Sequence, residues 1–307
     1  MVHESSQHAE EAVRCRRLRE LGVSVFECDL LRLPAQPPRW RVDVIYHLAA
    51  SATTEDPGAR FEVNSDGTCQ LLNWLGSSLK GKRVIYTGTL ASVDLEDLRL
   101  APVTEATPCT PKTPYGRTKL LGEEWVRKKA AEFGYDYTIL RLCTIVGRGY
   151  RPGGMFGVLP QLLRRDSWAS RLNWPGRVSL LSVTDLTEIL LALPTLSQTS
   201  NELYVASNGE TLTFDGILDE MARLLGVRRT RVCLPRWLWW FMGSVSWHAM
   251  STPGIPYRWQ NFAWRLSHLI RGGLWADAAK LNQALRRRFE SAADAMREIY
   301  ADPSRQL

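Results

Sequence analysis

Cysteine and histidine are scarce in this chain, and neither has the spacing of a metal site. The six cysteines include no Cys-x-x-Cys pair and the five histidines are dispersed, so we expect reduced cysteines and no metal. The first thirty residues carry charges throughout, which is not the pattern of a secretory signal peptide. Internal repeats and low-complexity segments are lacking as well. These absences favour a cytoplasmic protein in a reducing compartment.

Lysine is the scarcer basic residue, with 7 lysines against 32 arginines and a net charge of +7. Positive charge attracts phosphorylated cofactors or anionic surfaces, although an ordinary solvated surface explains it more simply. No basic block alternates with aromatic residues, which argues against a nucleic-acid groove. With 307 residues, 45% of them hydrophobic, the chain can bury a full core as one large domain or two linked ones.

Only one apolar stretch approaches the length of a membrane span. It runs from Leu234 to Met250 and is interrupted by Pro235, Arg236 and His248. We expect a helix that is buried or covered by a partner. The alternative is a helix in the plane of a membrane interface, because tryptophan favours that interface and arginines flank the segment. The stretch between Trp237 and Met250 would then be a peripheral membrane contact.

The most informative pattern pairs Tyr115 with Lys119, four residues further on. Residues 115–133 are rich in Lys, Arg, Glu, Leu and Ala, which predicts a helix with both side chains on one face. A nearby ammonium group favours the phenolate, so Tyr115 could exchange a proton near neutral pH. The spacing is weak evidence by itself, because nine tyrosines and seven lysines produce it readily by chance.

The segment upstream of this helix strengthens the pattern. Residues 83–89 read as a buried strand that ends in Thr89, at the edge where ligands bind in open parallel sheets. A hydroxyl group there could hydrogen-bond a substrate oxygen while Tyr115 moves the proton. Thr87 is the competing candidate, because residues two apart on a strand share a face. Residues 42–47 and 137–145 predict two further strands, and a helix begins near Asn64.

In this order, the strands and the Tyr–Lys helix resemble the extended short-chain dehydrogenase/reductase superfamily of NAD-dependent epimerases, dehydratases and 3β-hydroxysteroid-type dehydrogenases. The resemblance covers about residues 18–300. It implies an α/β fold with a Rossmann-like, doubly wound parallel sheet and a smaller, mostly helical C-terminal substrate domain. We expect residues 1–146, joined by 178–206, to form the dinucleotide-binding domain. Residues 147–177 and 207–307 would form the substrate-binding region.

The resemblance also implies a chemistry and a set of site residues. NAD or NADP would be the cofactor, and hydride transfer would occur at a carbinol or ketone carbon of a small-molecule substrate. Tyr115 would be the acid/base, Lys119 would lower its pKa and contact the nicotinamide ribose, and Thr89 would occupy the family's Ser/Thr position. The positions that match the cofactor side are Asp29 (against the adenine, after a strand at 23–27), His47, Ala49, Ala50, Asn64 and Thr87. For Asn64 and for the loop after His47, purely local structural roles are open alternatives.

One element of the family is not found in this sequence. A strand followed by a Gly-x-x-Gly-x-x-Gly loop should precede Asp29, but Gly22 is the only glycine there. The backbone N–H groups of that loop hold the cofactor pyrophosphate. We expect roughly 30 to 45 further codons upstream of Met1 that encode it, because a strand at 42–47 buried on both faces needs a second neighbour. The alternative is a cofactor-free relative that serves as a binding or scaffold subunit.

The substrate class stays open at this point. Arg148, Arg151 and Arg177 are candidates to bind the diphosphate of a nucleotide sugar, but none lies in a diagnostic motif. The tryptophan-rich C-terminal half makes a hydrophobic alcohol or ketone comparably plausible. Asp185 is either a site residue or a helix cap. Association into a homodimer is a further expectation.

Overall fold

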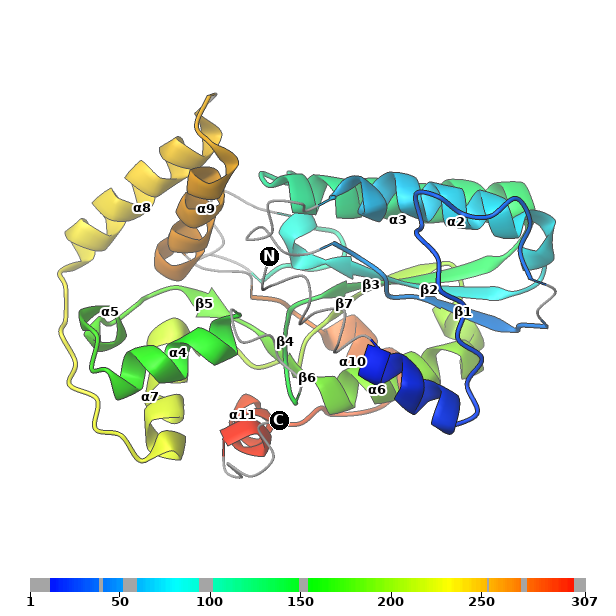
Figure 1. The fold of residues 1–307 in the computed structure, drawn as a ribbon. Coiled ribbons are helices and arrows are strands. Elements are labelled where there is room, and N and C mark those ends of the chain that lie inside the picture. Colours follow the sequence, from blue (N-terminus) through cyan, green and yellow to red (C-terminus); the bar gives the residue numbers. More distant parts are fainter. Residues whose placement is uncertain are drawn as a thin grey trace.

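A four-stranded parallel sheet lies in the right half of the molecule as it is drawn in Figure 1. The computed structural model describes residues 12–38, 41–51, 60–93, 102–148, 154–252, 254–271 and 275–300. The sheet has the strand order β1-β2-β3-β7, with β1 at Val44–His47, β2 at Arg83–Thr89, β3 at Asp136–Leu142 and β7 at Glu202–Ala206. All three strand pairs are parallel, so the carboxyl ends of the four strands meet at one edge.

Helices cover both faces of this sheet. On one face, α2 (Thr68–Leu75) and α3 (Pro114–Phe133) pack against alternate β2 residues such as Val84 and Tyr86. On the other face, α6 (Val183–Ala192) and α10 (Ala279–Leu285) pack with the intervening Ile85. Since both faces are buried, the central strands carry apolar side chains at adjacent positions, residues 84–86 in β2 and 139–140 in β3. The predicted doubly wound α/β fold is confirmed.

A second hydrophobic cluster lies beside the sheet, in the mostly helical part of the chain. Trp174, Met221 and Met296 are at its centre. The helices of this part of the chain are α4 (Met155–Arg164), α5 (Trp168–Arg171), α7 (Phe214–Leu225), α8 (Arg236–Ser251), α9 (Tyr257–Arg271) and α11 (Ala292–Tyr300). Two small ladders accompany them: β4 (Thr144–Val146) pairs with β6 (Leu180–Ser182), and β5 (Arg177–Val178) pairs with β8 (Leu212–Thr213).

The proposed boundary between the two regions needs one change at the C-terminal side. Residues 207–307 were predicted to belong entirely to the substrate region. In the structure Leu281 of α10 is fully buried in the cluster on the face of the sheet that α6 covers, and Lys280 donates a hydrogen bond to the Glu202 carboxylate of β7. Residues 279–289 therefore belong with the sheet.

The predicted strand at 23–27 is wrong, because this segment has no regular structure. Val23 and Phe26 are 46% and 44% exposed, and no strand in the described part of the chain pairs with them. The prediction that residues 42–47 are buried on both faces is also wrong. Within the described residues β1 is an edge strand, and its Tyr46 is 38% exposed. The single strand predicted at 137–145 breaks at Cys143, because β4 leaves the sheet to pair with β6.

The tryptophan-rich segment forms α8, of which one side is buried and the other is not. Trp239 and Trp247 are 5% and 9% exposed, as expected for a buried helix, whereas Trp240 is 61% exposed. In the described part of the chain, no helix combines the length and the apolar character needed to cross a membrane.

Candidate active site

The first turn of α3 brings Tyr115 to the end of β2. Thr113 caps the helix by accepting a hydrogen bond from the Gly116 N–H at 3.0 Å, and Pro114 occupies the first helical position, where its missing N–H costs nothing. Tyr115 is half-buried and lies close enough to Thr89, the last residue of β2, for the threonine hydroxyl to affect the pKa of the phenol. The two hydroxyl groups that the sequence singled out therefore meet at the carboxyl edge of the sheet.

Two glycines let α3 approach the sheet closely enough for this contact. A Cβ atom at Gly116 would lie 2.2 Å from the carbonyl oxygen of Ala91, and one at Gly122 would lie 2.2 Å from Tyr86 Oη. Real Cβ contacts are never that short, so a side chain at either position would push the helix away from β2. Gly116 in particular holds the backbone beside Tyr115 against the turn that follows Thr89.

Lys119 lies one turn further along α3 and is 2% exposed. Its ammonium nitrogen is 4.3 Å from the ring centroid of Tyr86, whose hydroxyl donates to the Lys119 carbonyl at 3.3 Å. Burial lowers the pKa of Lys119 to about 8, although the Glu123 carboxylate opposes this shift. No carboxylate among the described residues forms an ion pair with this ammonium group.

The pKa of Tyr115 differs from the sequence-based expectation. The sequence predicts that Lys119 lowers it, but burial raises the pKa of Tyr115 above its ordinary value, and the Thr89 hydroxyl offsets only part of this shift. Burial of the phenol removes water that would stabilise the phenolate. In this structure Tyr115 therefore holds its proton at neutral pH.

A buried ion pair supports the site from beneath, and the sequence did not reveal it. Glu123 is fully buried, and Arg141 of β3 donates to both its oxygens, at 3.0 Å and 2.8 Å. A Cβ atom at Gly88 would lie 2.6 Å from the Glu123 carboxylate, so the glycine between Thr87 and Thr89 makes room for it. The available signal was a glutamate four residues after Lys119, on the same helical face.

Asn64 ties the loop after β1 to α3. It is fully buried in a short π-helical turn, η1 (Val63–Gly67). Its amide accepts from the Ser51 N–H at 2.8 Å and donates to the Ser51 carbonyl at 3.0 Å and to Thr118 Oγ1 at 3.2 Å. These bonds use both N–H donors and one of the two lone pairs of the amide oxygen, which gives Asn64 a positioning role between the two segments.

His47, at the end of β1, is buried and neutral. Its Nε2 atom lies 2.8 Å from Thr68 Oγ1, and its carbonyl accepts from the Thr87 hydroxyl at 3.4 Å. Burial, with a smaller effect of the Lys119 charge, lowers the pKa of His47 to about 4. Thr87 thus contacts the strand next to it, whereas Thr89 is the threonine that meets Tyr115.

The remaining cofactor-side candidates fall into two places. Ala49 and Ala50 are exposed just beyond the carboxyl end of β1, where small side chains permit close approach of a ligand. Asp29 is instead in a turn, where it accepts from the Leu31 N–H at 2.9 Å and pairs with Arg60 at 3.2 Å. Its carboxylate is therefore already bonded within the chain.

The three candidate arginines do not form a single cluster. Arg148 lies 3.4 Å from the Glu298 carboxylate. Arg177 stacks its guanidinium group 5.2 Å from the ring centroid of Trp275. Arg151 lies outside the described residues. The structure thus assigns no diphosphate site to Arg148 and Arg177 together.

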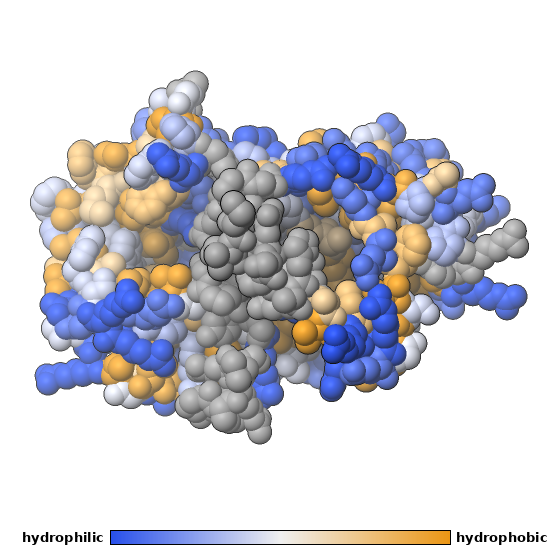
Figure 2. All heavy atoms as spheres, viewed as in Figure 1, coloured by the Kyte–Doolittle hydropathy of each residue, from blue (hydrophilic) through white to orange (hydrophobic). Residues whose placement is uncertain are grey.

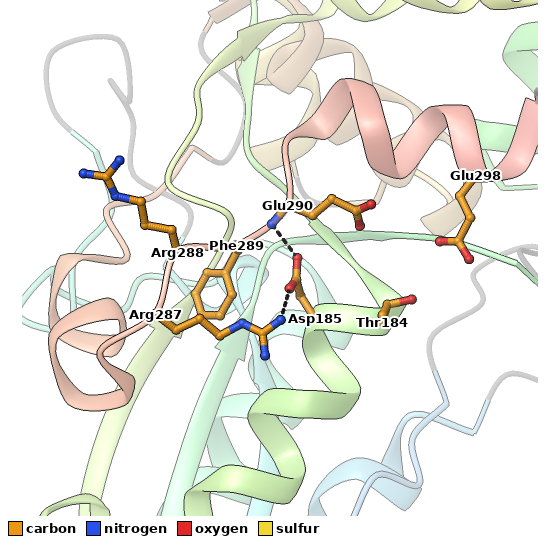
Figure 3. Close-up of a pocket in the computed structure, with 7 residues that line it drawn as sticks. All are labelled: Thr184, Asp185, Arg287, Arg288, Phe289, Glu290 and Glu298. Carbon is orange, nitrogen blue, oxygen red and sulfur yellow. Dashed lines mark hydrogen bonds and ion pairs between the residues drawn. The ribbon is translucent and has the colours of Figure 1, made fainter.

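A pocket of about 520 Å³ opens at the start of α6, and Asp185 belongs to it (Figure 3). Ser182, not Asp185, caps the helix. The buried Asp185 carboxylate accepts from the Glu290 N–H at 2.9 Å and lies 3.4 Å from Arg287, so it anchors the C-terminal segment. The pocket is lined by Thr184, Asp185, Arg287, Arg288, Phe289, Glu290 and Glu298, and is separate from the Tyr115 group.

Sequence comparisons match the chain to a family of epimerases and dehydratases. Residues 4–204 match the NAD dependent epimerase/dehydratase family. The chain is 30% identical over 122 residues to a putative UDP-glucose 4-epimerase of Methanocaldococcus jannaschii, an alignment that covers 38% of this chain and 39% of the relative. It is 28% identical over 120 residues to the UDP-glucose 4-epimerase of Streptococcus mutans, covering 38% and 34%. The aligned part thus spans about two-fifths or less of these relatives.

Solved structures share the fold. RMD from Pseudomonas aeruginosa, complexed with NADPH, superimposes with a TM-score of 0.65 at 18% identity, covering 90% of this chain and 86% of that one. UDP-glucuronic acid 4-epimerase from Bacillus cereus, in complex with NAD, gives 0.63 at 20% identity, covering 84% and 73%. The predicted resemblance to extended short-chain dehydrogenases is confirmed. Since the family match extends over more than half of its 307 residues, the chain belongs to the NAD dependent epimerase/dehydratase family.

Proposed function

We propose that this protein is an NAD(P)-dependent epimerase or dehydratase in which Tyr115 is the acid/base. One observation carries the proposal: Tyr115 and Thr89 lie together at the carboxyl end of β2, where the Thr89 hydroxyl affects the pKa of the phenol, and the buried Lys119 lies one turn away on α3. The strand β2 and the helix α3 thereby hold three groups in place: Tyr115 as the proton carrier, the Thr89 hydroxyl to orient the substrate oxygen, and Lys119 as the cation.

The residues around Lys119 fit the nicotinamide ribose of a dinucleotide. The three N–H donors of its ammonium group have no acceptor among the described residues, and a buried cation is stabilised when such donors are satisfied. Ribose hydroxyls would supply acceptors. Ala49 and Ala50 are small and exposed on the neighbouring strand end, so they would border the same ligand. When bound, the nicotinamide would accept a hydride from the substrate carbon and return it.

Tyr115 would carry the proton that accompanies this hydride. In the oxidation step, Tyr115 in its phenolate form would take the proton of the substrate hydroxyl, the O–H electron pair would form the second carbon–oxygen bond, and the hydrogen on the carbon would leave as hydride with its electron pair. In the return step, Tyr115 donates that proton to the ketone oxygen. Because burial raises its pKa, Tyr115 is ready to donate in the ligand-free protein, and it needs a nearby positive charge before it can accept. Lys119, four residues further along α3, is the candidate for that charge.

A nucleotide-linked sugar is the substrate class we propose. Support comes from the two relatives named as UDP-glucose 4-epimerases, which share 30% and 28% identity with parts of this chain. A hydrophobic alcohol or ketone is the competing class.

Substitution of the two threonines tests the proposal. Turnover of UDP-glucose is measured with NAD⁺ and with NADP⁺, by separation of nucleotide-sugar products. Thr89→Val removes the hydroxyl that meets Tyr115 and should lower the rate about 10- to 100-fold. Thr87→Val, two residues earlier on the same strand, is the matched control and should retain most activity. Equal loss in both variants would contradict the role of Thr89, and turnover of a simple ketone in place of any nucleotide sugar would contradict the substrate class.

A second candidate, a cofactor-free binding subunit, is favoured by one observation. No glycine-rich loop precedes β1 in the printed sequence, so these residues offer no cradle for the pyrophosphate. Titration with NADH and NADPH, followed by nicotinamide fluorescence, separates the candidates. Micromolar or tighter binding supports the enzyme, whereas absence of binding together with retained folding supports the binding subunit.

A further inference from the structure

Helices α8 and α9 form a hairpin (residues 236–271) at one end of the molecule, at the upper left in Figure 1. They pack closely, because Gly243 of α8 has no side chain. A Cβ atom at this position would lie only 3.0 Å from the Ile270 side chain and 2.9 Å from the Arg271 side chain of α9. Trp247, Met250 and Ala263 form the small core between the two helices. The hairpin therefore has its own packed interior.

The outer face of the hairpin is aromatic and exposed. On α8 the exposed side chains recur every three or four residues, which places them on one side of the helix, opposite the buried Trp239. On α9, Trp259 and Phe262 stand edge to face with ring centroids 6.3 Å apart. Hydrophobic colour gathers over α8 in Figure 2. The exposed set is Trp237 (68%), Trp240 (61%), Phe241 (56%), Val245 (53%), Trp259 (54%) and Phe262 (58%).

Charge in the hairpin has a single sign. Its 36 residues hold four arginines, six of the chain's twelve tryptophans, and no Asp, Glu or Lys. Arg236 and Arg258 are exposed in the first turns of α8 and α9, next in sequence to Trp237 and Trp259 of the aromatic face. Arg258 also stacks 5.6 Å from the ring centroid of Trp259. The aromatic face is thus bordered by positively charged guanidinium groups, and the segment contains no carboxylate that would neutralise them.

We propose that the outer face of the α8–α9 hairpin docks on an anionic lipid surface. Exposed Trp and Phe side chains bury apolar area at the depth of the headgroups, where tryptophan is favoured. The arginines add attraction to acidic headgroups and lie beside the aromatic face, where they can remain hydrated. Neither helix is long and apolar enough to span a bilayer, which leaves docking in the plane of the interface.

An anionic surface is favoured over a second copy of this chain by charge complementarity. Two such hairpins brought face to face would oppose arginines to arginines, with no acidic side chain in either segment to pair with them. The proposal is independent of the epimerase activity, because the hairpin contains none of the residues of the Tyr115 group.

Vesicle co-sedimentation tests the proposal on the whole protein. Phosphatidylcholine vesicles with about one quarter phosphatidylglycerol should bind the protein, and pure phosphatidylcholine should bind it much less. The double variant W240S/F241S should lower the partition coefficient about tenfold or more, since it removes two exposed aromatic side chains from the docking face. Trp168→Ser on α5, a tryptophan that is 70% exposed outside the hairpin, is the matched control and should bind like the parent.

Three outcomes would overturn the proposal. The first is failure of the parent to bind acidic vesicles, and the second is equal binding of W240S/F241S and the parent. The third is a dimer, seen by size-exclusion chromatography with light scattering, that W240S/F241S converts to a monomer, since a second copy would then cover the face. Thermal unfolding of each variant establishes that it is folded. Binding that weakens as salt rises from about 0.05 M to about 0.5 M is expected from the arginine contribution.

Discussion

Replacement of Lys119 by methionine should stabilise the fold, even though Lys119 lies at the candidate active site. Burial lowers its pKa from 10.5 to about 8, so at pH 7 the ammonium group is about 3 kcal/mol less favourable in the folded chain than in the unfolded chain. Methionine keeps most of the aliphatic side chain but loses the contact with the Tyr86 ring, which contributes about 1 kcal/mol. We expect a net gain of about 2 kcal/mol in the free energy of unfolding.

The pH dependence of this gain identifies its cause. Between pH 8 and pH 10.5 the folded protein has lost the Lys119 proton while the unfolded chain still binds it. The stability of the parent therefore rises with pH across this window, relative to the variant. The advantage of K119M should be largest below pH 8 and should fade towards pH 10.5.

Urea unfolding at pH 7 and near pH 10, followed by circular dichroism, measures the effect. Lys128→Met, an exposed lysine on the same helix, is the matched control and should change stability little at either pH. The reasoning is refuted if K119M is less stable than the parent at pH 7, or if its advantage is the same at both pH values.

Two other substitutions test the packing and charge of the site. His47→Gln should make the fold less sensitive to acid. The pKa of His47 is lowered from 6.5 to about 4, so the free energy of unfolding of the parent falls by up to about 3 kcal/mol as pH falls through this range. Urea unfolding at pH 7 and pH 4.5 should show a smaller fall in the variant. Gly116→Ala should cost about 1–3 kcal/mol or more and lower activity, because the new Cβ atom would lie 2.2 Å from a carbonyl oxygen. Gly216→Ala is the matched control, because Gly216 follows the capping Thr213 of α7 by three residues, as Gly116 follows Thr113. This variant should leave the melting temperature nearly unchanged. A Gln variant as acid-sensitive as the parent, or equal melting temperatures for the two alanine variants, would contradict these predictions.

The strand and helix that carry the site were predictable because their signals are local. Residues 83–89 form a strand with the expected bounds, and the helix expected from Tyr115 begins at Pro114 and ends at Phe133. Each segment has its own pattern, and Gly134 ends the helix in the left-handed conformation that glycine favours. The contact of Tyr115 with Thr89 followed from placing both at the carboxyl edge of a parallel sheet.

Other features depend on contacts that no local pattern contains. Residues 23–27 have the composition of a strand, but a strand forms only beside a partner. The pairing of Glu123 with Arg141 joins residues on different elements, and the space that Gly88 leaves for the carboxylate is visible only in three dimensions. The raised pKa of Tyr115 likewise depends on how much protein surrounds the phenol, which spacing to Lys119 does not reveal.

The rate of the Tyr115→Phe variant tests the central claim most directly. The change removes one hydroxyl group, keeps the ring that packs 6.5 Å from Phe61, and should leave the melting temperature close to that of the parent. Turnover of the nucleotide-sugar substrate should fall about 10²- to 10⁴-fold, because the proton of the reacting hydroxyl then has no carrier. Tyr137→Phe, at the opposite edge of the sheet, should keep the parent's rate. A Tyr115→Phe protein that turns over substrate as fast as the parent would contradict the assignment of Tyr115 as the acid/base.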